Sequence, residues 1–164
     1  MSITLVRVDD RIIHGQITTR RSRARRVHGI IVVGDKVAND DLRKRVLKAA
    51  AGKFKLGIYP TEYAVDKIKQ AKEHEKPYFI IAESPQVYAK LLKLGADFGD
   101  TLNIGPMNTR PGAKVLGRTA AVDEKDYEAF DYIENKGIKI NFQLLPDDDI
   151  RTWERMRKIY DSMD

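Results

Sequence analysis

Cysteine is absent from this chain of 164 residues. Its absence excludes a disulfide framework, a cysteine nucleophile, thiolate zinc sites and iron–sulfur clusters. The sequence also lacks an apolar run near the roughly 18 residues of a membrane-spanning helix and, at its beginning, the basic and then apolar layout of a signal peptide. These absences predict a cytoplasmic protein without a disulfide scaffold.

Several catalytic motifs are missing as well. The sequence contains only three histidines, and none stands in a His-x-x-x-His or Glu-x-x-His pattern, so no metal site is expected. Neither a Gly-x-Ser-x-Gly elbow nor a Walker phosphate loop occurs, and Gly105 followed by Pro106 is no dinucleotide fingerprint. Direct use of ATP is therefore not expected.

Acidic side chains are few at the beginning of the chain. Residues 1–26 hold seven arginines and two aspartates, whereas the net charge of the whole chain is +6. Arginine makes forked, permanently charged contacts to carboxylate and phosphate groups. The arginines within 20–26 therefore predict docking of an acidic partner, a phosphorylated ligand or nucleic acid. A solvated helix end without a partner is the alternative, and the sequence leaves it open.

Short apolar runs alternate with longer stretches of helical periodicity along the chain. This alternation is typical of βα units stacked around a mostly parallel sheet. Two of the runs, 29–33 and 78–82, are continuously apolar, as expected when helices cover both faces of a sheet. We therefore predict one α/β domain over residues 1–164, with three layers and a mainly parallel seven-stranded sheet. The expected strands are Ile3–Val8, Gly29–Val33, Lys55–Ile58, Tyr78–Ala82, Thr101–Ile104, Arg118–Val122 and Lys139–Gln143.

Capping residues mark the helices between these strands. Asn39 is a suitable N-cap for a helix over Asp40–Ala51, because its side chain can accept from the unpaired amides of the first turn. Pro85 favours another helix start, since proline at the first helical position sacrifices no hydrogen bond. The other helices are expected from Thr61, from Asp123 with Asp126 three residues on, and after Pro146 through Trp153 and Met156.

His14 differs from the other two histidines in its position. His28 precedes an expected strand and His74 lies in a charged helix end, where a structural or solvated histidine is the ordinary case. His14 follows the carboxyl end of the first expected strand, and ligands of parallel sheets gather at that edge. Histidine side chains ordinarily titrate near pH 6.5, so a neutral ring in this place can attack a phosphoryl group and form a phosphohistidine. A buried, hydrogen-bonded histidine is the alternative.

The residues around His14 suit such a reaction. Arg11 offers a forked donor to the incoming phosphoryl group, and Arg7 offers a second positive charge. The amides of Gly15 and Gln16 can point at phosphate oxygens where the next helix is expected to begin.

Two adjacent aspartates stand in the same segment. Asp9 or Asp10 could hold the second nitrogen of the histidine ring and fix its tautomer. Either could instead pair with Arg11 and simply orient it. The sequence leaves these alternatives open.

Residues 7–17 read RVDDRIIHGQI. They resemble the RIDDRLIHGQV hallmark of the IIB component of the mannose/fructose/sorbose family of the bacterial phosphoenolpyruvate:sugar phosphotransferase system. The likeness continues in order along nearly the whole chain, through residues 30–33, 37–44, 102–107, 122–126 and 137–139. The chain is identified by this resemblance as a member of that family.

The resemblance implies a cytoplasmic α/β domain with a central, mainly parallel seven-stranded sheet. His14 would accept a phosphoryl group from a phosphohistidine of the IIA component and transfer it to a sugar entering through the IIC and IID membrane components. Arg11 and Arg7 would be its charge partners, and Asp9 would support the loop. No metal or organic cofactor is implied. The donor protein would dock on Arg20, Arg21 and Arg23.

Two departures from the family pattern concern partner choice. Arg21 stands where family members commonly have tryptophan, and Pro106 where glycine is common. We interpret both as altered partner or sugar specificity. The identity of the sugar and the formation of a homodimer stay open.

A second function also stays open, that of a regulatory or binding module without catalysis. It would use Arg20–Arg26 on an acidic partner or on nucleic acid. Nucleic acid is not the expected partner, because the patch lacks interleaved aromatic residues and the rest of the chain is nearly balanced in charge.

Overall fold

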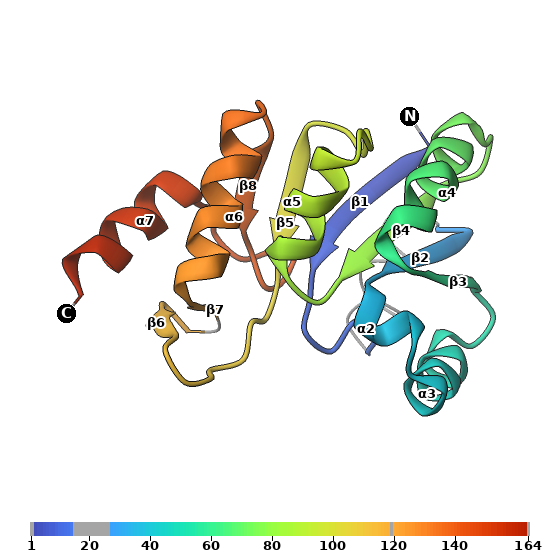
Figure 1. Cartoon of the computed structure of the whole chain (residues 1–164), viewed down its shortest axis with the longest axis horizontal. Coiled ribbons are helices and arrows are strands. Elements are labelled where there is room, and N and C mark those ends of the chain that lie inside the picture. Colours follow the sequence, from blue (N-terminus) through green and yellow to red (C-terminus); the bar gives the residue numbers. More distant parts are fainter. Residues whose placement is uncertain (1, 15–26, 119, 164) are drawn as a thin grey trace.

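The structure is a computed structural model, which describes residues 2–14, 27–118 and 120–163. The strands of its central sheet are β1 (Ile3–Val8), β2 (Gly29–Val33), β3 (Lys55–Tyr59), β4 (Tyr78–Ala82), β5 (Thr101–Ile104), β8 (Lys139–Phe142) and β9 (Arg151–Thr152). Their order across the sheet is β3-β2-β4-β1-β5-β8-β9, and neighbours are parallel except for β9, which runs antiparallel to β8 (Figure 1). The predicted α/β fold with a mainly parallel seven-stranded sheet is confirmed.

Helices cover both faces of this sheet. They are α2 (Asp35–Ala38), α3 (Asp41–Ala51), α4 (Thr61–Glu73), α5 (Pro85–Lys93), α6 (Glu124–Asn135) and α7 (Trp153–Ser162). Side chains alternate along each strand: Ile80 and Ala82 of β4 join the core formed with α4, α5 and α6, whereas Phe79 and Ile81 join the core formed with α2 and α3. Both faces of β4 are therefore buried, which explains why its sequence is continuously apolar. Of the helices in the described ranges, none is long and apolar enough to cross a membrane.

Two helix starts show how local hydrogen bonds set the boundaries. α6 begins after Asp123, as predicted, and its start is a capping box, in which the carboxylates of Asp123 and Asp126 each accept from the other residue's amide. The prediction for α3 is wrong by one residue, because Asp40 is the N-cap and accepts from the first turn at 3.0 Å. Asn39 instead donates its side-chain amide to the carbonyl of Asp35 at 2.8 Å, so its side chain does not cap α3.

The expected strand at 118–122 does not belong to the central sheet. Ala120–Val122 forms β7, which pairs antiparallel with β6 (Lys114–Leu116) in a separate hairpin. The seventh strand of the central sheet is instead β9, whose two exposed residues are too few to show a periodic pattern. Because the chain first pairs with β8 through β9, α7 begins at Trp153, later than the predicted start after Pro146.

β1 is the strand that positions the candidate site. It lies between β4 and β5 and is parallel to both. The strands that follow it in the chain first build one side of the sheet, from β2 to β4, and then the other side from β5 onward. Ligands of open α/β sheets bind in the crevice at such a switch point, outside the carboxyl ends of the strands. The residues that follow β1 lie at that edge.

Candidate active site

Backbone hydrogen bonds fix the loop after β1 against both neighbouring strands. The amide of Asp9 donates to the carbonyl of Ala82 at the end of β4 at 2.9 Å, and the amide of Asp10 donates to a carbonyl of the loop after β5 at 3.1 Å. Ile12 has a φ of +61°, which β-branched residues rarely adopt, and its side chain is completely buried. This turn brings the chain back over the strand end, so that His14 lies against Asp9.

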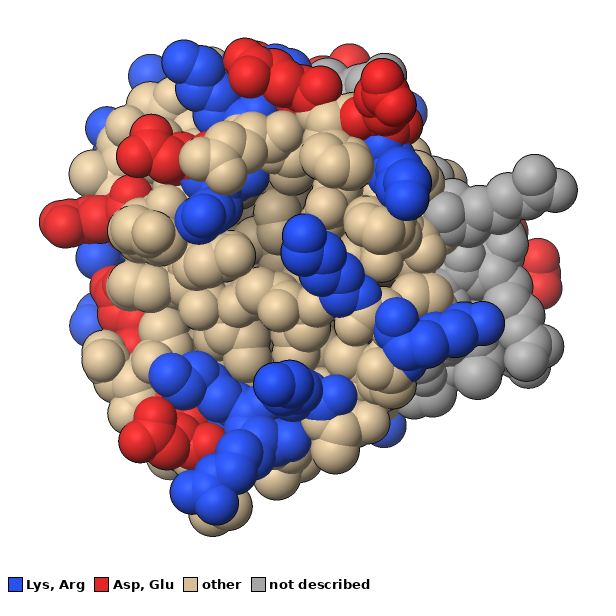
Figure 2. All heavy atoms as spheres, turned by 90° about the vertical axis from the view of Figure 1, so that its right-hand side faces the viewer, with Lys and Arg blue, Asp and Glu red and all other residues tan. Residues whose placement is uncertain are grey.

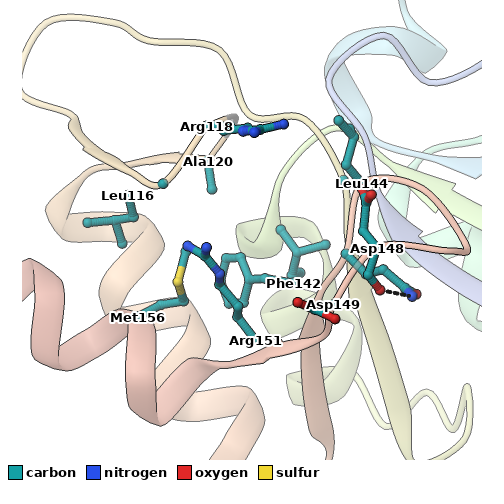
Figure 3. Close-up of a pocket in the computed structure, with 13 residues that line it drawn as sticks. Leu116, Arg118, Ala120, Phe142, Leu144, Asp148, Asp149, Arg151 and Met156 are labelled. Atoms are coloured by element: carbon teal, nitrogen blue, oxygen red, sulfur yellow. Dashed lines mark hydrogen bonds between the residues drawn. The ribbon is translucent and has the colours of Figure 1, made fainter.

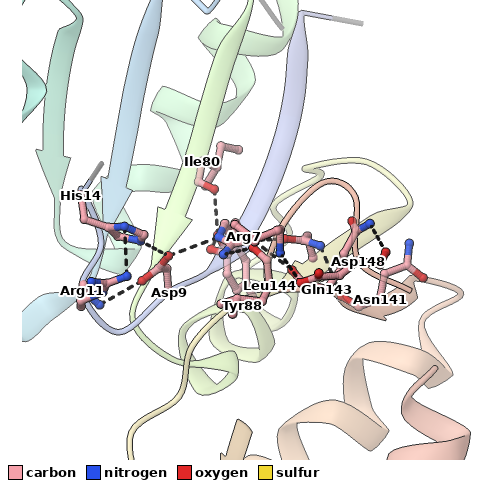
Figure 4. Close-up of polar contacts among 12 residues, drawn as sticks. Arg7, Asp9, Arg11, His14, Ile80, Tyr88, Asn141, Gln143, Leu144 and Asp148 are labelled. Carbon is pink, nitrogen blue, oxygen red and sulfur yellow. Dashed lines mark hydrogen bonds and ion pairs between the residues drawn. The ribbon is translucent and has the colours of Figure 1, made fainter. Parts of the chain in front are cut away.

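Both ring nitrogens of His14 have side-chain partners (Figure 4). Nε2 lies 2.7 Å from Oδ2 of Asp9, and Nδ1 lies 3.1 Å from Nη2 of Arg11. The side chain is 11% exposed, so the ring can be reached from the surface. A carboxylate only accepts hydrogen bonds, so Nε2–H donates to Asp9, and in the neutral ring Nδ1 carries the lone pair. The guanidinium of Arg11, a donor, is consistent with that tautomer.

Asp9 is completely buried and connects the ring to a second arginine. Its Oδ2 atom also lies 3.3 Å from Nε of Arg7, and its Oδ1 atom accepts from the amide of Arg11 at 3.1 Å. Burial by itself raises the pKa of Asp9, but the hydrogen bond from His14 and the charge of Arg7 outweigh it and hold the pKa below its ordinary value. Asp9 is therefore an ionised carboxylate at neutral pH that orients the ring.

Arg7 is also completely buried. Its Nη1 atom donates to the side-chain oxygen of Asn103 and to the carbonyl of Gln143, the latter at 3.3 Å, and its Nη2 atom donates to the carbonyl of Leu144 at 3.2 Å. These contacts direct the guanidinium toward the β8–β9 loop (Figure 4). Arg7, expected as a second charge beside the phosphate, thus reaches the ring through the carboxylate of Asp9.

A substitution at Gly105 tests how tightly this guanidinium is held. A Cβ atom added there would clash with Nη2, Cζ and Nε of Arg7, which can move only by giving up its hydrogen bonds. We expect Gly105→Ala to lower the free energy of unfolding by about 1–3 kcal/mol, the usual cost of overpacking, as measured by urea denaturation. In an Arg7→Met background the same change should cost much less. An equal cost in both backgrounds would show that Arg7 is not the clashing group.

The lowered pKa of Asp9 predicts how stability depends on pH. The ionised carboxylate of Asp9 stabilises the folded state fully above the pKa of an unfolded aspartate, about 4. This stabilisation is lost as the pH falls through the lower pKa that Asp9 has in the folded state. We therefore expect the difference in unfolding free energy between the wild-type protein and Asp9→Asn to shrink below about pH 4. Urea denaturation of both proteins across the acidic range measures this. A difference that stays constant would contradict the role assigned to Asp9.

Asp10 does not hold the ring. Its carboxylate accepts from the amide of Asn108 in the loop after β5. Of the two aspartates that the sequence leaves open, Asp9 is therefore the one in contact with the histidine. Arg43 at the start of α3 also contacts the loop, although the sequence carries no signal for it. Its Nη1 atom lies 2.8 Å from Oε2 of Glu83, and its Nη2 atom lies 3.4 Å from the carbonyl oxygen of Asp10. α3 therefore borders the loop.

The other predicted site residues fall outside the described part of the chain. They are Gly15, Gln16, Arg20, Arg21 and Arg23. The phosphate-binding amides and the docking arginines, with the alternative function that uses Arg20–Arg26, therefore stay predictions.

The two remaining histidines lie away from this loop. The rings of His28 and His74 stack with centroids 6.0 Å apart, and both meet the ring of Tyr78 edge-on. Since Tyr78 begins β4 and His28 precedes β2, this cluster lies at the opposite edge of the sheet. Across residues 2–14, 27–118 and 120–163, no group of three His, Asp or Glu side chains could hold a metal ion.

A basic face lies next to the loop. Figure 2 shows Lys and Arg side chains over the middle and lower parts of the face formed by α3, α4 and β3, with Asp and Glu mainly toward its margins. Leu42 and Val46 of α3 are 69% and 59% exposed on this helix. An acidic protein surface would be attracted here, because opposite charges accelerate encounter. The basic residues of α3 are Arg43, Lys44, Arg45 and Lys48.

Known proteins share both the sequence and the fold. The family model for the PTS system sorbose subfamily IIB component matches residues 3–163. The chain is 34% identical over 149 residues to the sorbose-specific EIIB component of Klebsiella pneumoniae, with 90% of each chain covered. It is 33% identical over 154 residues to the mannose-specific EIIAB component of Escherichia coli (strain K12), with 90% of this chain and 46% of that protein covered.

A solved structure agrees with these matches. The crystal structure of the IIBSor domain of the sorbose permease from Klebsiella pneumoniae superimposes with a TM-score of 0.87 at 32% identity, over 99% of each chain. Sequence and fold thus agree over nearly the whole length, and the resemblance carried by residues 7–17 is confirmed. The chain belongs to the sorbose subfamily of the IIB components of the phosphotransferase system, phosphotransferases that act as phosphocarriers in sugar phosphotransfer.

Proposed function

We propose that His14 carries the phosphoryl group and that Nδ1 is the atom that bonds to phosphorus. The lone pair of Nδ1 attacks the phosphorus of a phosphohistidine on the IIA component, and the bond between phosphorus and the donor nitrogen breaks. No proton has to move, because the His14 ring keeps its Nε2–H and takes on the positive charge that the donor ring gives up. The oxygen of a sugar hydroxyl then bonds to phosphorus, and the bond between phosphorus and Nδ1 breaks with its electron pair returning to the ring. The hydroxyl proton passes to solvent, and the ring becomes neutral again.

The single observation that carries this proposal is the contact of 2.7 Å between Nε2 and the buried carboxylate of Asp9. It directs Nδ1 to be the nucleophile, because the proton is held on the other nitrogen. The same carboxylate stabilises the positive ring that forms when phosphorus is bound. Asp9 is therefore a positioning residue that also lowers the energy of the phosphorylated state.

Arg11 is the group we place beside the phosphoryl oxygens. Its Nη2 atom lies 3.1 Å from Nδ1, so the guanidinium already occupies the side from which phosphorus must approach. Moving off the ring lets the same N–H groups donate to phosphate oxygens in forked, charge-assisted hydrogen bonds. The amides of Gly15 and Gln16 are the predicted additional donors.

The partners follow from the family. We infer a IIA phosphodonor, IIC and IID membrane components and a sugar as the acceptor, and with these partners a cytoplasmic location. The basic face around α3 supports an acidic donor surface, since it borders the loop that holds His14. The transfer chemistry needs no second copy of the chain, and the formation of a homodimer stays open. The extent of the domain over residues 1–164 stays a prediction.

Phosphorylation of the wild-type chain is the direct test. Incubated with phosphoenolpyruvate, the general phosphocarriers and a IIA component of this subfamily, the chain should gain one acid-labile phosphoryl group. Peptide fragmentation should place it on His14, and phosphorus–nitrogen NMR couplings should place it on Nδ1. An adduct on His28, on His74 or on Nε2 would contradict the proposal.

A further inference from the structure

A cavity of about 290 Å³ lies beyond Arg7, on the side away from the histidine ring. The ends of β5 and β8, the β6–β7 hairpin and the segment leading into α7 enclose it (Figure 3). Its apolar lining consists of side chains that are almost fully buried, chiefly Leu116, Phe142 and Met156. The volume is close to the lower end of the range for small-molecule sites.

Charged side chains surround this apolar lining. Arg118 comes from the hairpin and Arg151 from β9, so the two guanidinium groups reach the cavity from opposite walls (Figure 3). Within the described ranges, neither has a hydrogen-bond or ion-pair partner. Asp148 and Asp149 of the β8–β9 loop also line the cavity, and one oxygen of Asp148 accepts from the amide of Leu145 at 2.9 Å. Unpartnered guanidinium groups at one cavity are typical of a site for a phosphate or carboxylate.

We propose that this cavity binds a phosphorylated monosaccharide. Arg118 and Arg151 hold the phosphate, and the carboxylates of Asp148 and Asp149 accept hydrogen bonds from sugar hydroxyls. The ring of Phe142 packs against the apolar face of the sugar. A bare anion would leave the two carboxylates facing it without a donor, which favours a ligand that carries hydroxyl groups. The choice of a sugar phosphate among small organic phosphates rests on the proposed function, whose product belongs to this class.

The wall of the cavity is also the support of Arg7. The carbonyl groups of Gln143 and Leu144, two residues that line the cavity, accept from its guanidinium, and Gly105, which also lines it, lies against the same group. A ligand in the cavity therefore contacts the residues that hold Arg7 against Asp9. Since Asp9 orients the nucleophilic ring, binding of a sugar phosphate is coupled to the phosphoryl carrier through a chain of direct contacts.

Isothermal titration calorimetry of the unphosphorylated full chain with mannose 6-phosphate and with sorbose 1-phosphate tests the binding. At least one of them should bind about tenfold or more tightly than inorganic phosphate and than the free sugar, because phosphate and hydroxyl contacts act together. Arg118→Gln and Arg151→Gln should each weaken binding about tenfold. Arg155→Gln is the matched control, since it removes the same charge from an exposed position on α7 and should leave binding unchanged.

Arg11→Gln separates this site from the phosphoryl site. Binding that is lost in Arg11→Gln but kept in Arg151→Gln would place the ligand at His14 and overturn the proposal. Equal affinity for inorganic phosphate, or no binding of either sugar phosphate, would overturn it too. Because the unphosphorylated chain is titrated, each of these failures is distinct from a failure of His14 to accept a phosphoryl group.

Nitrogen-15 NMR of the histidine rings tests the coupling. At the sugar phosphate concentration that just saturates the wild-type chain, the ring signals of His14 should shift. At the same concentration they should shift less in Arg151→Gln, because its occupancy is lower. Signals of His28 and His74 serve as internal controls, because both rings lie at the opposite edge of the sheet. Unchanged His14 signals at full occupancy would refute the coupling.

Discussion

Replacing His14 with glutamine is expected to abolish the phosphoryl adduct while leaving the fold in place. The side-chain amide of glutamine can donate to Asp9 as Nε2 of the ring does, so the buried pair of Asp9 and Arg7 keeps its surroundings. An amide nitrogen has no available lone pair, and no bond to phosphorus can form. Loss of transfer should therefore be complete, because the nucleophile itself is gone.

Intact-mass measurement after incubation with the phosphodonor, together with urea denaturation, checks this prediction. The adduct should be absent and the denaturation midpoint close to that of the wild-type chain. His28→Gln and His74→Gln are the matched controls, since each removes one of the other two imidazoles and should retain the adduct. If His14→Gln were still phosphorylated at the wild-type rate, another residue would be the carrier.

Asp9→Asn is the second substitution with a large expected effect, and it acts on both stability and transfer. Burial lowers the pKa of Arg7, and the charge of Asp9 is the first of the effects that oppose this. Without that charge a guanidinium remains buried without a counterion, which costs about 3–5 kcal/mol of unfolding free energy. The ring also loses the group that fixes its tautomer, so we expect transfer to slow by about 10²–10⁴-fold.

Urea denaturation measures the effect on stability. The rate at which the donor phosphorylates the chain, its loading rate, measures the effect on transfer. Asp10→Asn is the matched control, because Asp10 is the adjacent aspartate, accepts from Asn108 and does not touch the ring. It should load at close to the wild-type rate. Wild-type loading in Asp9→Asn at a temperature where the variant is folded would show that Asp9 does not direct the ring.

The fold was largely predictable because its buried strands have a strong local signal. β2 and β4 are continuously apolar, and both of their faces are covered. The error at residues 118–122 has a physical reason: a short run that ends in apolar residues, as Ala120–Val122 does, is compatible with a strand but carries no information on which sheet it joins. β9 could not be predicted for a different reason. Its two exposed residues form a strand only because the loop before them returns the chain alongside β8.

The candidate site, like the fold, could be predicted only in part. His14, Arg11 and Asp9 lie within six consecutive residues, so a local pattern was enough to select them. The direction of Arg7 was not predictable, because its partners are Asn103 and carbonyl groups of the β8–β9 loop, and a carbonyl group has no sequence signal. Arg43 was missed for the same reason, since only the packing of α3 brings it to the loop.

The sequence by itself determined the class of fold, the family and the histidine to be tested, because each depends on residues that are close together in the chain or on periodicity within one element. The tertiary structure decided which of two adjacent aspartates contacts the ring, which ring nitrogen lies beside that carboxylate, and that Arg7 reaches the ring through Asp9. It also brought Arg118 of a hairpin and Arg151 of β9 to one cavity. These outcomes depend on which strand ends meet at one edge of the sheet, and strand order is set by packing over the whole chain.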